Sequence, residues 1–152
     1  MDRTPYAEEF LIHQLEIVIS NIRKPSYREE IQKLMNNREW FGIFKRAKDR
    51  KLRNYTGGIL ERTASIGALS LCLYDNYPMI EIDLILSGVV VAGFRDSVGK
   101  KQIYDNLSNS ELKSVAFKKS RKKPKLEYFL FDELFKIDIK VVSNRKKHNI
   151  IS

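Results

Sequence analysis

The sequence predicts a single α+β domain, in which N-terminal helices pack on a mostly antiparallel sheet of about five strands and a helical insertion precedes the last two strands. Three patterns predict this fold class. Apolar residues recur with helical spacing up to position 57, they alternate with polar residues from 69 to 92, and they form two short runs after position 126. We therefore assign a helical part to residues 1–57, a sheet-containing part to 58–143 and a basic tail to 144–152.

Three helices are expected before Gly57-Gly58. Thr4-Pro5 predicts a helix start, because threonine caps N-termini and proline suits the first turn. The helical spacing that follows is carried by Leu11, Leu15, Val18 and Ile22. Ser26 and Glu29 form a capping-box pattern, which predicts a second, short helix. A third helix carries aromatic residues on one side and ends before the glycine pair.

A three-stranded antiparallel meander is expected next. The first strand would place on one face the side chains of Leu69, Leu71 and Leu73. The segment 75–78 has the composition of a turn. The segment 80–87 alternates between apolar and polar residues, as a strand with one buried face does. Ser87-Gly88 then predicts a tight turn into a third strand, Val89–Ala92.

The remaining elements complete the expected sheet. From Asp96 to Lys119 the apolar spacing favours helix, and this segment is the predicted insertion. Two strands are expected at Leu126–Phe131 and Lys136–Val142. With 152 residues, of which 43% are hydrophobic, the chain can bury one core without a metal or a disulfide.

The sequence carries no sign of export or membrane insertion. Cys72 is the single cysteine, so no intramolecular disulfide can form, and its apolar surroundings predict a buried thiol in a reducing compartment. The first residues lack the pattern of a signal peptide. The longest apolar run, Leu84–Phe94, is far shorter than the ~20 residues that span a bilayer. We expect a cytoplasmic protein that does not interact with membranes.

The positive charge of the chain is concentrated in runs. Lysine and arginine number 28 against 19 acidic residues, a formal net charge of +9. Like charges crowded on a small domain repel one another, and a bound polyanion relieves that repulsion and releases counterions. We therefore expect a non-catalytic protein that binds DNA or RNA. The expected phosphate contacts are Lys45, Arg46, Lys48, Arg50, Lys51 and Arg53 in one run and Lys113, Lys118, Lys119, Arg121, Lys122, Lys123 and Lys125 in another, with Arg145–Lys147 as a third group.

Aromatic residues precede the first basic run. Trp40, Phe41 and Phe44 lie on the same expected helix as these cations. Aromatic rings beside cations can stack on the bases of a single strand. Helical spacing favours the alternative, in which Trp40 and Phe44 anchor the helix to the core. Small size and a composition rich in lysine, asparagine and isoleucine would suit a phage or plasmid accessory protein.

A catalytic alternative rests on four residues. Glu81 and Asp83 are two apart on an expected strand and would share a face, as would Asp138 and Lys140 on a later strand. Carboxylates that converge from adjacent strands can hold Mg²⁺ for phosphoryl transfer or phosphodiester cleavage. Asp138-Ile139-Lys140 resembles the acid-x-Lys element of PD-(D/E)xK nucleases, and Glu81–Leu84 resembles the paired acidic strand of minimal nucleotidyltransferases. Each resemblance covers only a few residues.

Two further interpretations remain open. The same carboxylates can simply pair with lysines across the strands of a sheet, in which case no metal or other cofactor is expected. The basic face can also belong to an interaction module, an inhibitor or adaptor, that docks on an acidic protein.

Overall fold

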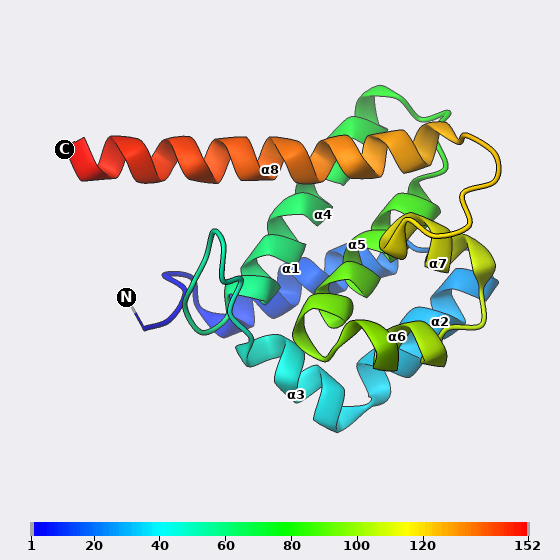
Figure 1. The fold of residues 1–152 in the computed structure, drawn as a ribbon, viewed down its shortest axis with the longest axis horizontal. Helices are drawn as coiled ribbons and strands as arrows, with labels where there is room; N and C mark the ends of the chain where they lie inside the picture. The colour runs from blue at the N-terminus through cyan, green and yellow to red at the C-terminus, as the bar shows by residue number, and fades with distance from the viewer. Residues whose placement is uncertain (1, 152) are drawn as a thin grey trace.

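A computed structural model describes the backbone of residues 2–151 and the side chains of residues 2–146, and in this part of the chain the only regular elements are helices (Figure 1). The predicted α+β class is therefore wrong, since the segments assigned to strands are helical. The eight helices are α1 (Glu8–Ser20), α2 (Pro25–Asn36), α3 (Arg38–Arg46), α4 (Gly58–Asn76), α5 (Ile82–Ser97), α6 (Lys100–Asn106), α7 (Ser110–Phe117) and α8 (Leu126–Ile151).

The predicted N-terminal helices are confirmed as α1, α2 and α3, although their ends differ. Helix α1 begins at Glu8, four residues after Thr4, whose hydroxyl donates to Glu61 and accepts from the Tyr6 amide. Helix α3 is capped by Asn37, whose side chain accepts a hydrogen bond from the Trp40 amide. It ends at Arg46, so residues 47–57 form a loop and not the end of a helix.

Helix α5 is the centre of the fold and contacts each of the other seven helices. Its residues Leu84–Phe94 are all buried, without a break. A helix covered on every side needs no polar face, so its sequence loses helical period and resembles a buried strand. This is why the predicted meander is wrong: α4 and α5 occupy its place, packed against each other.

The predicted insertion is helical, as α6 and α7, but it interrupts no sheet. The two strands expected after it are one helix, α8, which runs along one side of the molecule and projects past the other helices (Figure 1). Tyr128, Phe131 and Leu134 form its buried side. Leu126, Phe129 and Ile137 are exposed, and this mixture hid the helical period.

The loop 47–57 is fitted tightly against the start of α4. Gly57 adopts a φ of 87°, in the left-handed region that glycine tolerates best. A Cβ atom at Gly58 would collide with the main-chain oxygen of Arg53 and lie 2.9 Å from the Asp49 amide nitrogen. The glycine pair therefore brings the loop close enough for Asp49 and Arg53 to enter the interior.

Candidate nucleic-acid-binding clefts

A buried ion network joins the loop 47–57 to α4 and α8. The Arg53 side chain is only 3% exposed and donates to Asp138 at 2.6 and 3.0 Å and to Glu61 at 3.0 Å. Asp49 lies 3.4 Å from the same guanidinium. Burial opposes the charge of Arg53, but hydrogen bonds to Asp138 and Glu61 outweigh it and raise its pKa. Arg53 is thus a structural cation, fixed by acids from two helices.

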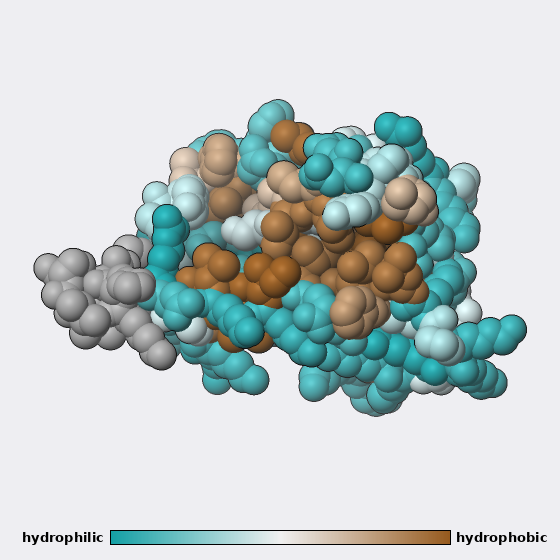
Figure 2. Space-filling model, turned by 90° about the horizontal axis from the view of Figure 1, so that it is seen from above, coloured by the Kyte–Doolittle hydropathy of each residue, from teal (hydrophilic) through white to brown (hydrophobic). Residues whose placement is uncertain are grey.

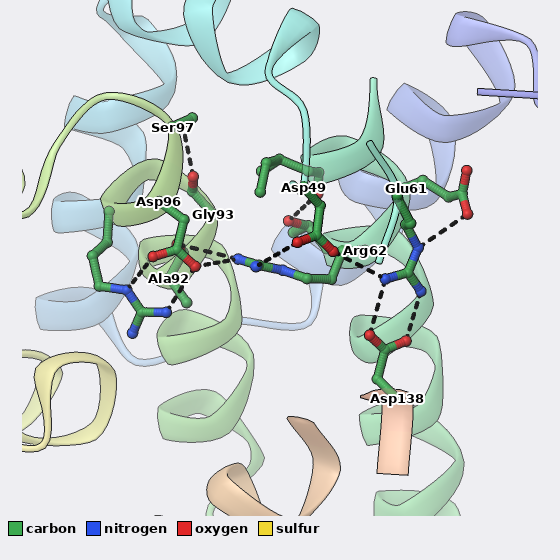
Figure 3. A network of polar contacts seen from close by, with 12 residues as sticks. Asp49, Glu61, Arg62, Ala92, Gly93, Asp96, Ser97 and Asp138 are labelled. Atoms are coloured by element: carbon green, nitrogen blue, oxygen red, sulfur yellow. Dashed lines mark hydrogen bonds and ion pairs between the residues drawn. The ribbon is translucent and has the colours of Figure 1, made fainter. Parts of the chain in front are cut away.

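A second arginine network lies beside the first (Figure 3). Arg62 of α4 reaches between Asp49, at 3.9 Å, and Asp96 of α5, to which it donates at 2.7 Å. Arg95 donates to both oxygens of Asp96 and to the Ala116 carbonyl. Burial disfavours the charged form of Asp96, yet Arg95 and Arg62 lower its pKa below the ordinary value of 3.8. Asp96 therefore remains ionised and holds both arginines in position.

Two clefts open on either side of this Arg95–Asp96 pair. The first, of about 580 Å³, is lined by five cations against two acids: Arg95, Lys100, Lys101, Lys118 and Lys119 against Asp96 and Asp105. The second, of about 490 Å³, is lined by five cations against three acids: Lys48, Arg50, Lys51, Arg62 and Arg95 against Asp49, Asp96 and Asp138. Because both contain Arg95 and Asp96, the two form one continuous basic surface, which we call the basic clefts.

The basic clefts contain part of each predicted run. The first run contributes Lys48, Arg50 and Lys51, and the second contributes Lys118 and Lys119. Lys113 lies at the edge, with its ammonium 4.5 Å from the centre of the Tyr104 ring. Segments about 70 residues apart in the sequence are thus brought to adjoining clefts by α5, which carries Arg95 and Asp96.

Other cations of the two runs have different surroundings. Arg121 donates to Asp132 and to main-chain carbonyls at the end of α7, and Lys125 bridges Glu81 and Glu111. The hydrogen bond to Glu111 raises the pKa of Lys125. Lys122 and Lys123 are exposed and line neither cleft. A separate pocket beside Thr4 and Glu8 is lined by Lys45 and Arg46.

The third basic group lies on α8. Arg145 and Lys146 are exposed there, and Lys147 is outside the residues whose side chains are described.

Sequence reasoning missed four cations of the basic clefts: Arg62, Arg95, Lys100 and Lys101. For Arg95, the available signal was its position directly after the apolar run that ends at Phe94.

The four residues of the catalytic alternative lie in two separate places, with Glu81 and Asp83 at the start of α5 and Asp138 and Lys140 on α8. The Asp83 carboxylate accepts from the amides of Arg23 and Lys24, whereas Asp138 is paired with Arg53. The amide of Glu81 donates to Glu127 on α8, and Asp138 is eleven residues further along that helix, or about 16 Å. Lys140, two residues after Asp138, is exposed.

The strand geometry behind the two family resemblances is wrong. Glu81 and Asp83 lie at the start of α5, and Asp138 and Lys140 lie on α8, so neither pair projects from a strand. Among the described side chains, no three His, Cys, Asp or Glu residues are grouped closely enough to hold a metal ion.

The aromatic residues before the first run belong mainly to the core. Phe44 is fully buried and stacks on Phe94 with ring centres 4.7 Å apart. Trp40 and Phe41 are partly buried against the same core. Tyr104, in the first cleft, has the ammonium groups of Lys113 and Lys119 over its ring at 4.5 and 5.1 Å.

Comparison with protein-family models, curated proteins and solved structures found no match to this chain. Within residues 2–151, no helix combines the length and the apolar character needed to cross a bilayer.

Proposed function

We propose that this protein binds nucleic acid through the sugar–phosphate backbone, with the basic clefts as the contact surface. The observation that carries the proposal is the convergence of cations from the 48–51 loop, α4, α5, α6 and the segment after α7 on two clefts that share Arg95. In both clefts cations outnumber acids, and such an excess of positive charge attracts a polyanion.

The charges of the basic clefts divide into a fixed and an exposed set. Arg62 and Arg95 are held by Asp96, so their positions are set before any ligand arrives. Lys48, Arg50 and Lys51 are exposed, as are Lys118 and Lys119. Exposed cations can follow a phosphate backbone without leaving buried acids unpaired, which makes these five the expected phosphate contacts.

Base stacking has less support than phosphate contact. Of the aromatic residues in the first cleft, Tyr104 is covered by two lysines and Phe117 packs edge-on against it, at 5.2 Å between ring centres. We therefore expect binding with little sequence preference and a strong dependence on salt.

The test is binding of fluorescently labelled oligonucleotides of about 20 nucleotides, as single-stranded DNA, duplex DNA and RNA, followed by anisotropy at several salt concentrations. We expect the logarithm of affinity to fall linearly with that of salt, by about 0.7–0.9 per phosphate contact. The double variants K118A/K119A and R50A/K51A should each lower that slope by about 1–2 and weaken binding.

The matched control is K122A/K123A, which removes the same charge from the same run but from outside both clefts. It should weaken binding less than K118A/K119A. Absence of binding at low salt rejects the proposal. Equal effects of the two lysine pairs would show that net charge, and not the clefts, governs binding. Retention of an acidic protein after nuclease treatment, with no oligonucleotide binding, would favour the interaction module instead.

A further inference from the structure

The outward side of α8 carries apolar residues that no other element of the described structure covers. Leu126, Ile137 and Val141 are 55%, 45% and 56% exposed, and Leu130 beside them is half-buried. Their spacings of four, seven and four residues place them on one side of a helix with 3.6 residues per turn. Figure 2, which looks onto the α8 side of the molecule, shows apolar side chains gathered in one area of this face.

This apolar area includes a groove between α4 and α8. The groove encloses about 350 Å³, and its walls are Leu69, Cys72, Leu73, Asn76 and Tyr77 on one side and Leu130, Glu133, Leu134 and Ile137 on the other. Contrary to the expectation of a buried thiol, Cys72 is exposed in it. Apolar surface of this kind, bordered by polar residues, is typical of a protein–protein contact.

Beyond Asp138, α8 extends past the body of the molecule. None of the side chains from 139 to 146 is buried, although Ile139, Val141 and Val142 are apolar and β-branched. Such residues are poor helix formers unless they are packed. The protruding half of α8 therefore has the composition of a helix that packs against something.

The charges of α8 indicate what covers this side. Its first half carries the acids Glu127, Asp132 and Glu133 and the cation Lys136, which pairs with Glu133 at 3.1 Å. Beyond Asp138, the charges among the described side chains are the cations Lys140, Arg145 and Lys146. Glu133 and Lys140 are seven residues apart, or about two turns, so they lie on the same side of the helix. Their midpoint falls beside Ile137. A second α8 running antiparallel, with the two-fold axis near Ile137, would bring Glu133 of each copy to Lys140 of the other.

We propose that a second copy of this chain covers this surface, as a two-fold dimer in which the two α8 helices pack antiparallel over the groove between α4 and α8. The arrangement is isologous, so each apolar and each ionic contact occurs twice. An acidic partner helix would match the cations of α8 but leave Glu133 facing like charge, whereas the chain itself matches both halves.

The dimer leaves the basic clefts open. The second cleft takes Phe135, Asp138 and Ile139 from α8, and the groove takes Leu130, Glu133, Leu134 and Ile137 from another side of the same helix. The proposal is therefore independent of nucleic-acid binding and can be tested without a ligand.

The first test is sedimentation equilibrium from low-micromolar to sub-millimolar protein. We expect a monomer–dimer equilibrium that I137Q shifts toward monomer by at least about tenfold in Kd, because each substitution acts twice in a two-fold interface. The matched control is I17Q, since Ile17 is an isoleucine 38% exposed on α1 and outside the groove. It should leave the Kd unchanged. Circular dichroism checks that both variants fold.

The second test uses Cys72, the single cysteine of the chain, as a reporter. Its reaction with a thiol reagent should slow as protein concentration rises through the dimerisation range, and I137Q should abolish that slowing. Reversal of one charge, E133K, should weaken the dimer, and the exchange E133K/K140E should restore it.

Three outcomes overturn the proposal. The chain could remain monomeric throughout the concentration range, I17Q and I137Q could weaken association equally, or a dimer could form without protecting Cys72. The last two would place the contact elsewhere.

Discussion

Helices α5 and α8 are both rich in apolar residues, yet they use them in opposite ways. In α5 the eleven residues Leu84–Phe94 are all buried, and the helix contacts every other helix of the described chain. In α8 the apolar residues surround the helix but only one side is buried, and a buried ion pair at Asp138 replaces apolar packing midway along it. Hydrophobic density alone therefore does not distinguish the centre of a fold from a surface helix with a second contact face.

The largest expected effect contrasts one phenylalanine from each helix. Phe94 of α5 is fully buried and stacks on Phe44, so F94A should lower the free energy of unfolding by about 3–5 kcal/mol. Phe129 of α8 is 59% exposed, and F129A should cost less than about 1 kcal/mol. Urea denaturation at neutral pH measures both. Similar losses for the two variants would contradict the difference between the helices.

The second prediction concerns the ion network that attaches α8. R53M removes the cation and leaves Asp138, Glu61 and Asp49 with buried or nearly buried carboxylates. Loss of one partner from a buried ionic cluster costs about 3–5 kcal/mol, and the same chemical denaturation reports it.

The control for this variant is R50M, at an exposed position of the same loop. It should change stability by less than about 0.5 kcal/mol. If R53M is as stable as the original chain, the network contributes no net stability and α8 is held by its apolar contacts alone.

The contrast also explains which parts of the fold the sequence could predict. Helix α1 follows helical spacing because its Leu11, Leu15 and Val18 are buried while Phe10 and Ile17 are exposed, so most of the apolar residues mark one side. Helix α5 has no polar side that would reveal helical spacing. In the residues that lead into it and form its first turn, Ile80–Leu86, apolar and polar side chains happen to alternate. Alternation within a helix that is buried all round carries no information about strand structure.

The candidate site was predictable in part. Linear charge density identified Lys48, Arg50 and Lys51 and the pair Lys118-Lys119, which line the basic clefts. It could not separate them from Arg53, whose partner Asp138 is 85 residues away. Which cations of a run are neutralised depends on tertiary contacts, and these follow only once α8 is recognised as one helix.

A third prediction concerns the ion pairs that Asp96 forms at the C-terminal end of α5. The pKa of Asp96 is lowered in the folded state, so unfolding takes up a proton, and the stability due to Asp96 is present above its ordinary pKa and lost as pH falls through the folded value. D96N should reduce stability at neutral pH by about 1–2 kcal/mol, since Arg62 and Arg95 lose a charged partner.

The pH dependence distinguishes this ionic contribution from a packing defect. As pH falls from 3.8, the ordinary pKa of the carboxyl, through the lower pKa of Asp96 in the folded state, the stabilities of D96N and the original chain should converge. Urea denaturation between neutral pH and that range measures the difference. A difference that stays constant with pH would show that ionisation of Asp96 contributes nothing.

The smallest expected effect compares two fully buried serines. The Ser70 hydroxyl of α4 donates to the Ile66 carbonyl, whereas the Ser87 hydroxyl of α5 has no hydrogen-bond partner among the described residues. S70A should cost about 1 kcal/mol, because it removes a buried hydrogen bond. S87A should raise stability by about 0.5–1 kcal/mol, because it removes an unsatisfied polar atom and alanine is the better helix former. Thermal unfolding of the two variants should give opposite shifts in Tm if α5 is packed without a polar side. A lower Tm for S87A would mean that the Ser87 hydroxyl has a hydrogen-bond partner in solution. Even the central helix would then keep a polar contact.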